Sequence, residues 1–212
     1  MNVLHILANP RPVEESTSKQ LAAAFFGRLV ERNPEAMVNN VDLYSEPPPY
    51  LNLEAWRYFH QGKIDPNYKP SKIQENATNY ARNQGEALRQ ADVLVITVPM
   101  WGGSAPAIFK SWIDQVMQPG IMFDFGPEGV KPLHQLRRVI VLVASGDVYK
   151  EGDPRDGLST MLTNNFGFIG VTDISYAWAD GQEKSIFDDA DERKQSAVEA
   201  AQDLAEEIAE LP

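Results

Sequence analysis

Hydrophobic and polar positions follow two kinds of spacing along this chain, one typical of strands and one typical of helices. Residues 2–8, 92–98 and 138–144 are almost continuously apolar and rich in Val, Ile and Leu. That pattern indicates strands covered on both faces, as in a parallel sheet. Residues 37–43 and 171–178 alternate more strongly, as strands nearer a sheet edge do. The pattern therefore predicts five strands.

Helical patterns lie between these strands. Apolar positions recur at helical spacing in residues 16–32, 76–91, 155–168 and 190–211, and in a segment that contains Ile108, Trp112, Ile113 and Val116. Strands that alternate with helices imply βαβ units with right-handed crossovers. We therefore expect an α/β fold, a three-layer sandwich around a five-stranded parallel sheet of order 2-1-3-4-5, in one domain that spans residues 1–212.

One segment interrupts this alternation. Residues 44–71 are too long for an ordinary connection and hold five prolines, one Trp, one Phe and four Tyr. Long loops of this kind are usually functional or interfacial. We expect this aromatic-rich excursion to line a pocket or to pack on a second subunit.

Composition narrows the class of protein. The net charge of −11 gives an acidic surface, which argues against binding to nucleic acid. The absence of cysteine excludes disulfides, thiolate nucleophiles and cysteine-ligated metals, and we predict no metal site. The first residues carry no basic leader, and no segment approaches the roughly 20 apolar residues that a membrane span needs. We expect a soluble, cytoplasmic protein that binds no membrane.

The predicted architecture directs attention to three loops. Ligands of such sheets bind beyond the C-terminal ends of the strands, where the strand order reverses. The first loop, NPRPVEESTSKQ, ends in Ser16, Thr17 and Ser18 at a helix start. Hydroxyls and free N–H groups there can bind an anion, although N-capping alone explains the same residues. Because no glycine-rich motif is present, a monophosphate fits better than a dinucleotide or a triphosphate.

The second loop opens the stretch PMWGGSAPAIFKSWID, residues 99–114. Met100 and Trp101 offer apolar surface to a ring system. We expect Gly102 and Gly103 to let a flat ligand approach the backbone, and we do not expect a turn to require them. The alternative is that the Met and the Trp are core residues that cover the strand ends.

The third loop, ASGDVYKEGD, follows the fourth predicted strand. Ser145, Gly146 and Asp147 come first and Tyr149 follows. Taken alone, this is ordinary turn chemistry. One loop suited to phosphate and two suited to a planar ring nevertheless match a single ligand, flavin mononucleotide (FMN).

Several motifs carry a family resemblance along essentially the whole chain. PMWGGSAPAIFKSWID is similar to the signature of the FMN-dependent NADH-azoreductases, which are flavodoxin-like NAD(P)H:quinone reductases. The Ser-Thr-Ser run resembles their phosphate loop, and FDFGPEGV and NNFGFIGVTDI resemble two later stretches. Two departures stand out. The usual Asn-Phe is Gly102-Gly103 here, and the usual second glycine of the third loop is Asp147, whose carboxylate we expect to point away from the flavin.

The resemblance implies site residues as well as a fold. The residues expected to contact FMN are Asn9, Ser16, Thr17, Ser18, Pro99, Met100, Trp101, Gly102, Gly103, Ser145, Gly146 and Asp147. Phe125 and Phe166 are expected in the substrate-pocket wall, contributed by the partner subunit, because the family is dimeric with sites at the interface. Tyr149 is a candidate catalytic residue that donates a hydrogen bond to flavin or substrate, and a packing role is the alternative.

The resemblance also implies the reaction. NADH or NADPH would pass a hydride to FMN, and a quinone or azo compound would then take two electrons in a ping-pong mechanism. Two alternatives stay open: a flavodoxin-type one-electron carrier, and a regulatory FMN-binding protein without turnover. Of the three histidines, we expect His5 to be a core residue, and His60 and His134 to lie in loops. We also expect Trp101→Ala and Gly103→Trp to impair turnover more than stability.

Overall fold

Five parallel strands form the central sheet, in the order β2-β1-β3-β6-β7. The computed structural model describes residues 1–150 and 152–211. The strands are β1 (Asn2–Leu7), β2 (Met37–Asp42), β3 (Val93–Pro99), β6 (Arg138–Ala144) and β7 (Ile174–Ala179). Counted along the chain, this is the predicted order 2-1-3-4-5. The strand order reverses between β1 and β3, as the sequence indicated.

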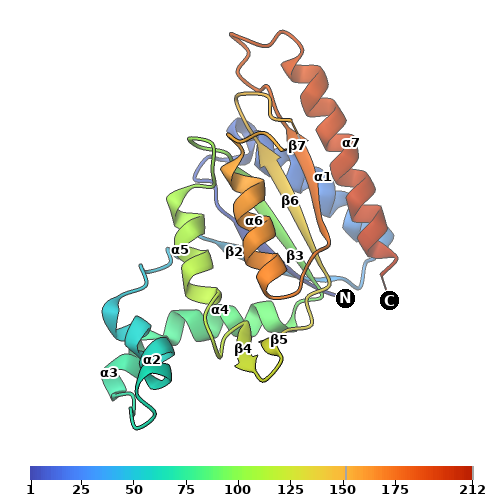
Figure 1. Ribbon diagram of the computed structural model, residues 1–212. Coiled ribbons are helices and arrows are strands. Elements are labelled where there is room, and N and C mark those ends of the chain that lie inside the picture. Colours follow the sequence, from blue (N-terminus) through green and yellow to red (C-terminus); the bar gives the residue numbers. More distant parts are fainter. Residues whose placement is uncertain (151, 212) are drawn as a thin grey trace.

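Helices cover both faces of the sheet and complete the predicted three layers (Figure 1). One face carries α1 (Thr17–Arg32) and α7 (Ala190–Ala209). The other carries α4 (Asn79–Gln90), α5 (Ala107–Val116) and α6 (Gly157–Phe168). Because helices pack on both sides, all seven residues of β3 are buried, which explains its continuous apolar sequence.

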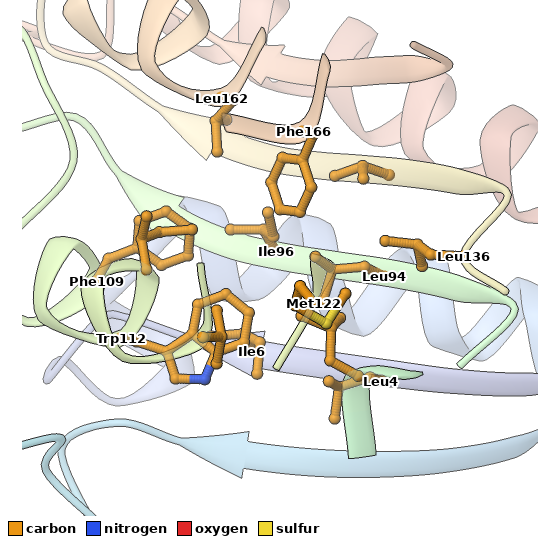
Figure 2. Close-up of a cluster of buried hydrophobic side chains, with 14 of the residues drawn as sticks. Leu4, Ile6, Leu94, Ile96, Phe109, Trp112, Met122, Leu136, Leu162 and Phe166 are labelled. Atoms are coloured by element: carbon orange, nitrogen blue, oxygen red, sulfur yellow. The ribbon is translucent and has the colours of Figure 1, made fainter. Parts of the chain in front are cut away.

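The larger hydrophobic core lies between the sheet and helices α4, α5 and α6. Figure 2 shows its centre, where Phe109 and Trp112 of α5 and Phe166 of α6 point toward Ile96 of β3. The indole of Trp112 is fully buried, and its Nε1 donates to Gln84 Oε1 at 3.0 Å, so this buried donor is satisfied.

The excursion at residues 44–71 is not a plain loop. It contains α2 (Leu53–Ile64) and leads into α3 (Lys72–Ala77). Asn52 caps α2 by accepting from the backbone N–H of Ala55, and Ser71 opens α3 with a capping box. Helix α2 buries its residues Ala55 and Phe59, whereas its Trp56 is 40% exposed.

A short antiparallel hairpin follows α5. It consists of β4 (Phe123–Gly126) and β5 (Gly129–Pro132), which the sequence pattern did not predict as strands. The ring of Phe123 lies 5.0 Å from that of Phe168, the last residue of α6. The hairpin therefore lies at the end of α6 that is remote from the third loop, as Figure 1 also shows.

Among the described helices, none combines the length and the apolar character needed to cross a membrane.

Candidate functional site

The three loops singled out from the sequence meet at one edge of the sheet. The N–H of Ala8 donates to the Thr97 carbonyl at 2.9 Å, and the N–H of Met100 donates to the Ala144 carbonyl at 2.8 Å. Each bond extends the strand pairing one step past a strand end. The first, second and third loops therefore leave the sheet side by side.

The first loop holds a buried cluster of polar side chains. Asn9 Nδ2 donates to Ser16 Oγ at 2.8 Å and to Ser18 Oγ at 3.1 Å, and all three residues are at most 3% exposed. Ser16 Oγ also accepts from the N–H of Lys19, so N-capping of α1 is confirmed. Because Ser16 Oγ already accepts two hydrogen bonds, its own proton is left to donate, and Ser18 Oγ lies 3.4 Å away as one acceptor. Half-buried Thr17 lies between the two serines.

This cluster has the chemistry of an anion site. Hydroxyl donors stand at the first turn of α1, where helical N–H groups lack intrahelical acceptors and the helix dipole favours negative charge. Asn9 fixes both serine side chains in place, and Asn9 Oδ1 in turn accepts from the N–H of Arg11 at 3.0 Å. The donor set suits a phosphate group without a metal ion or a lysine.

The second loop is a two-residue turn. The N–H of Trp101 donates to the Ser104 carbonyl at 2.8 Å, and the N–H of Ser104 donates back at 3.1 Å. The two residues between them, Gly102 and Gly103, have φ of 58° and 75°. Such a turn requires positive φ at both central positions. The interpretation that these glycines are not needed for a turn is therefore wrong.

The two apolar residues of the second loop have different environments. Met100 is only 8% exposed and belongs to the larger core, as the alternative interpretation allowed. Trp101 is 48% exposed at the sheet edge, two residues after Pro99, the last residue of β3. Trp101 is thus the side chain of this loop that offers open aromatic surface to a ligand.

The third loop rests on β7 through a tryptophan. Trp178 Nε1 donates to the buried Ser145 Oγ at 2.8 Å, and Ser145 Oγ donates to the Asp147 carbonyl at 2.8 Å. The ring of Tyr149 stacks on that of Trp178, with centroids 5.7 Å apart. Tyr149 thus has a packing role, and its hydrogen bond to a ligand stays a prediction. Gly146 lies exposed between these anchored positions.

The carboxylate of Asp147 is paired. It accepts from Arg155 Nη1 and from the N–H of Val148. The Val148 N–H, and after it the Arg155 guanidinium, hold the pKa of Asp147 below its usual range. Arg155 was missed because the sequence pattern placed it at the start of a helix, over residues 155–168. Helix α6 begins two residues later, at Gly157, and Asp156 caps it.

The two phenylalanines assigned to a pocket wall have opposite environments. Phe166 is fully buried in the core (Figure 2), so its assignment to a pocket wall is wrong in this chain. The exposed phenylalanine of α6 is Phe168, at 49%, and Phe125 is 54% exposed on the hairpin. Both rings contact Phe123, with centroid distances of 5.4 Å for Phe125 and 5.0 Å for Phe168. Leu158, Leu162 and Phe166 are four residues apart, and this spacing already places Phe168 off the buried stripe.

None of the three histidines lies in these loops. His5 is a core residue, as predicted: its ring nitrogens bond Asn40 Oδ1 and Thr97 Oγ1, both at 2.8 Å. Burial lowers the pKa of His5 to about 4. His60 lies in α2 rather than in a loop, so that expectation is wrong. His134 lies in the loop after β5, where its Nε2 donates to the Ile169 carbonyl at 3.1 Å.

Comparison with known proteins places the chain in a family. A family model described as a flavodoxin-like fold matches residues 1–205. This chain belongs to that family. The FMN-dependent NADH:quinone oxidoreductase of Gluconacetobacter diazotrophicus is 31% identical over 206 residues, which are 95% of this chain and 96% of that protein. The protein of the same name from Nitratidesulfovibrio vulgaris is 34% identical, over 97% of this chain and 99% of that protein.

A solved structure supports the same placement. The azoreductase from Bacillus anthracis strain Sterne superposes with a TM-score of 0.85 at 27% identity. The match covers 97% of this chain and 99% of that protein. The flavodoxin-like fold expected from the sequence motifs is thus confirmed.

The residues present fit FMN. Asn9, Ser16 and Ser18 form a fixed cluster of phosphate donors. Trp101 offers exposed aromatic surface one loop away, and the third loop follows on the other side of β3.

Proposed function

We propose that this protein is an FMN-dependent NADH:quinone oxidoreductase that passes two electrons from NADH or NADPH to quinones and azo compounds by a ping-pong mechanism. The observation that carries the proposal is the arrangement of the three loops, with a buried phosphate-donor cluster and an exposed tryptophan at the same sheet edge. The names of the similar proteins, an NADH:quinone oxidoreductase and an azoreductase, support it.

The residues of the chain bind and orient the cofactor. Ser16, Thr17, Ser18 and the first-turn N–H groups of α1 hold the phosphate, with Asn9 fixing the serines. The second and third loops hold the ring system, the second through Trp101 and backbone groups. FMN, when bound, supplies the two-electron chemistry, because it accepts a hydride and gives up the electrons to a second substrate.

The further ring contacts assigned to the cofactor come from residues 99–103 and 145–147. Pro99 ends the buried strand β3 and buried Met100 follows it, so both anchor the second loop. Gly102, Gly103 and Gly146 present backbone without side chains, so a flat ring can approach their N–H groups. Tyr149, whose ring stacks on that of Trp178, would donate a hydrogen bond to flavin or substrate.

A homodimer completes the site in this proposal. Helix α6 has 12 residues, which corresponds to about 18 Å at 1.5 Å per residue. The third loop precedes α6 and Phe168 ends it, so Phe125 and Phe168 are too remote to line the pocket of their own chain. The same phenylalanines from a second copy would cover the flavin. We place the dimer in the cytoplasm, with no nucleic acid or membrane partner.

Steady-state kinetics test this proposal. Under anaerobic conditions, the FMN-loaded protein should oxidise more than one equivalent of NADH only when a quinone is present, and double-reciprocal plots at several quinone concentrations should be parallel, as for a ping-pong reaction. A one-electron carrier would need a separate reductase to oxidise NADH. A regulatory flavoprotein would retain FMN without turnover. Either behaviour would refute the reductase assignment.

A further inference from the structure

Arg155 joins several parts of the third loop. Its Nη1 donates to Asp147 Oδ2, its Nη2 donates to Asp153 Oδ2 at 2.7 Å, and Nη2 also donates to the Val148 carbonyl at 3.2 Å. Its guanidinium lies 5.1 Å from the centre of the Tyr149 ring. One side chain therefore contacts most of the loop that follows β6.

The backbone around Arg155 contacts the second loop. The N–H of Gly157 donates to the Gly103 carbonyl at 2.8 Å. A Cβ added at Gly103 would lie 2.8 Å from the Arg155 carbonyl oxygen, so the two backbones touch. Arg155 thus connects the two loops that hold the flavin ring in the proposed function.

The positive charge of Arg155 affects the flavin site through its ion pair with Asp147. This carboxylate lies in a loop expected to contact the flavin. A flavin becomes more negative on reduction, so an uncompensated carboxylate beside it would oppose reduction. The guanidinium of Arg155 offsets part of that charge, because it pairs with Asp153 as well as with Asp147.

We propose that Arg155 is a positioning residue of the flavin site, which holds the third loop against the second and offsets the negative charge of Asp147. The inference rests on the proposed function, because it needs FMN at these loops. It concerns the pair of Arg155 and Asp147, and it predicts coupled effects of the two side chains on the midpoint potential of bound FMN.

The expected stability effect is small. The side chains of Arg155 and Asp147 are 56% and 50% exposed, and ion pairs this exposed contribute little to the free energy of unfolding. The midpoint potential of bound FMN is a more sensitive readout, because it responds to local charge. A purely structural role would not shift it in the two opposite directions described below.

The test compares Arg155→Gln, Asp147→Asn and the double variant with the unchanged protein. For each, the Kd for FMN, the midpoint potential of bound FMN and the urea unfolding of the apoprotein are measured. Arg155→Gln should raise the Kd about two- to fivefold and lower the potential. Asp147→Asn should raise the potential, and the double variant should return it close to the starting value.

Arg32→Gln is the matched control. It removes the same charge from an ion pair with Glu206 whose arginine side chain is 54% exposed, at the far end of α1. The Kd and the potential of this control should not change.

Three results would overturn the inference. In the first, the unchanged protein binds FMN but Arg155→Gln alters neither the Kd nor the potential. In the second, the Kd rises but the potential stays fixed, which leaves Arg155 a merely structural role. In the third, the double variant fails to restore the potential. If the unchanged protein cannot bind FMN at all, the proposed function fails together with this inference.

Discussion

The backbones of Gly103 and Arg155 lie in direct contact, although the two residues belong to different loops. A Cβ at Gly103 would lie 2.8 Å from the Arg155 carbonyl oxygen, and the φ of Gly103 is 75°. Gly103 is therefore restricted twice, by its backbone conformation and by its neighbour. The neighbouring Gly102, with φ of 58°, has no other group within 4 Å of such a Cβ among those described.

This contrast predicts different outcomes for two alanine substitutions. Gly102→Ala should lower the free energy of unfolding by about 1–2 kcal/mol, because alanine is strained at positive φ. Gly103→Ala should lower it further, because the Arg155 backbone must also shift. Urea unfolding of both apoproteins measures the difference, and equal losses would contradict the account.

The same contact revises an expectation from the sequence. Gly103→Trp should lower the free energy of unfolding as well as turnover, because the Arg155 backbone leaves no room for a Cβ at position 103. Trp101→Ala removes an exposed ring that is not part of the buried core, so it should lower turnover and change the free energy of unfolding by less than about 1 kcal/mol. Comparing turnover per bound FMN with urea unfolding of this variant checks the expectation. A large loss of stability with unchanged turnover would refute it.

Another prediction concerns the phosphate cluster. Asn9→Ala removes the donor that holds both Ser16 and Ser18, so the Kd for FMN should rise by about tenfold, the effect of roughly 1.4 kcal/mol. Fluorescence titration of the apoprotein with FMN measures it. Ser71→Ala, which removes the cap of α3, is the control and should leave the Kd unchanged.

Phe166 and Phe168 allow a prediction that compares a buried ring with an exposed one on the same helix. Phe166→Ala should lower the free energy of unfolding by about 3–5 kcal/mol, because the ring is fully buried. Phe168→Ala should cost less than about 1 kcal/mol in unfolding of the monomer but weaken dimerisation and turnover. Denaturation and sedimentation velocity measure these effects. A dimer unaffected by Phe168→Ala would argue against the interface assigned here.

The lowered pKa of buried His5 makes the stability of the protein depend on pH. Burial lowers its pKa from 6.5 to about 4, so between these values the unfolded chain binds a proton that the folded protein does not. Neutral His5 therefore contributes fully to the free energy of unfolding above pH 6.5. This contribution is lost as the pH falls toward 4, by roughly 3 kcal/mol in all.

The variant His5→Gln isolates this effect. Urea unfolding at pH 7.5 and pH 5 should show a smaller decrease in the variant than in the unchanged protein, because glutamine does not titrate. An equal decrease in both proteins would assign the pH dependence to other groups.

The strands and their order could be predicted because the sheet is covered on both faces. Residues 92–98 are apolar at nearly every position, and β3 is buried at every position. Helix α2 was missed because its sequence is rich in aromatic residues and flanked by prolines, which resembles a long loop. Asn52 before α2, and the Ser71 to Gln74 spacing before α3, were the capping signals that could have revealed both helices.

The candidate site was only partly predictable. Ser16 and Ser18 follow a strand and open a helix, so their position follows from local pattern. The partnership of Arg155 with Asp147 joins residues eight positions apart across an irregular loop, where no periodicity applies. The positive φ of Gly102 and Gly103 likewise depends on a turn that spacing alone does not specify.

An anaerobic absorbance titration tests the central claim most directly. The purified, FMN-loaded protein is titrated with NADH and then receives a pulse of benzoquinone. We predict that NADH bleaches the flavin absorbance band and that the quinone restores it fully. A band that NADH cannot bleach would contradict the assignment of this protein as an NADH:quinone oxidoreductase.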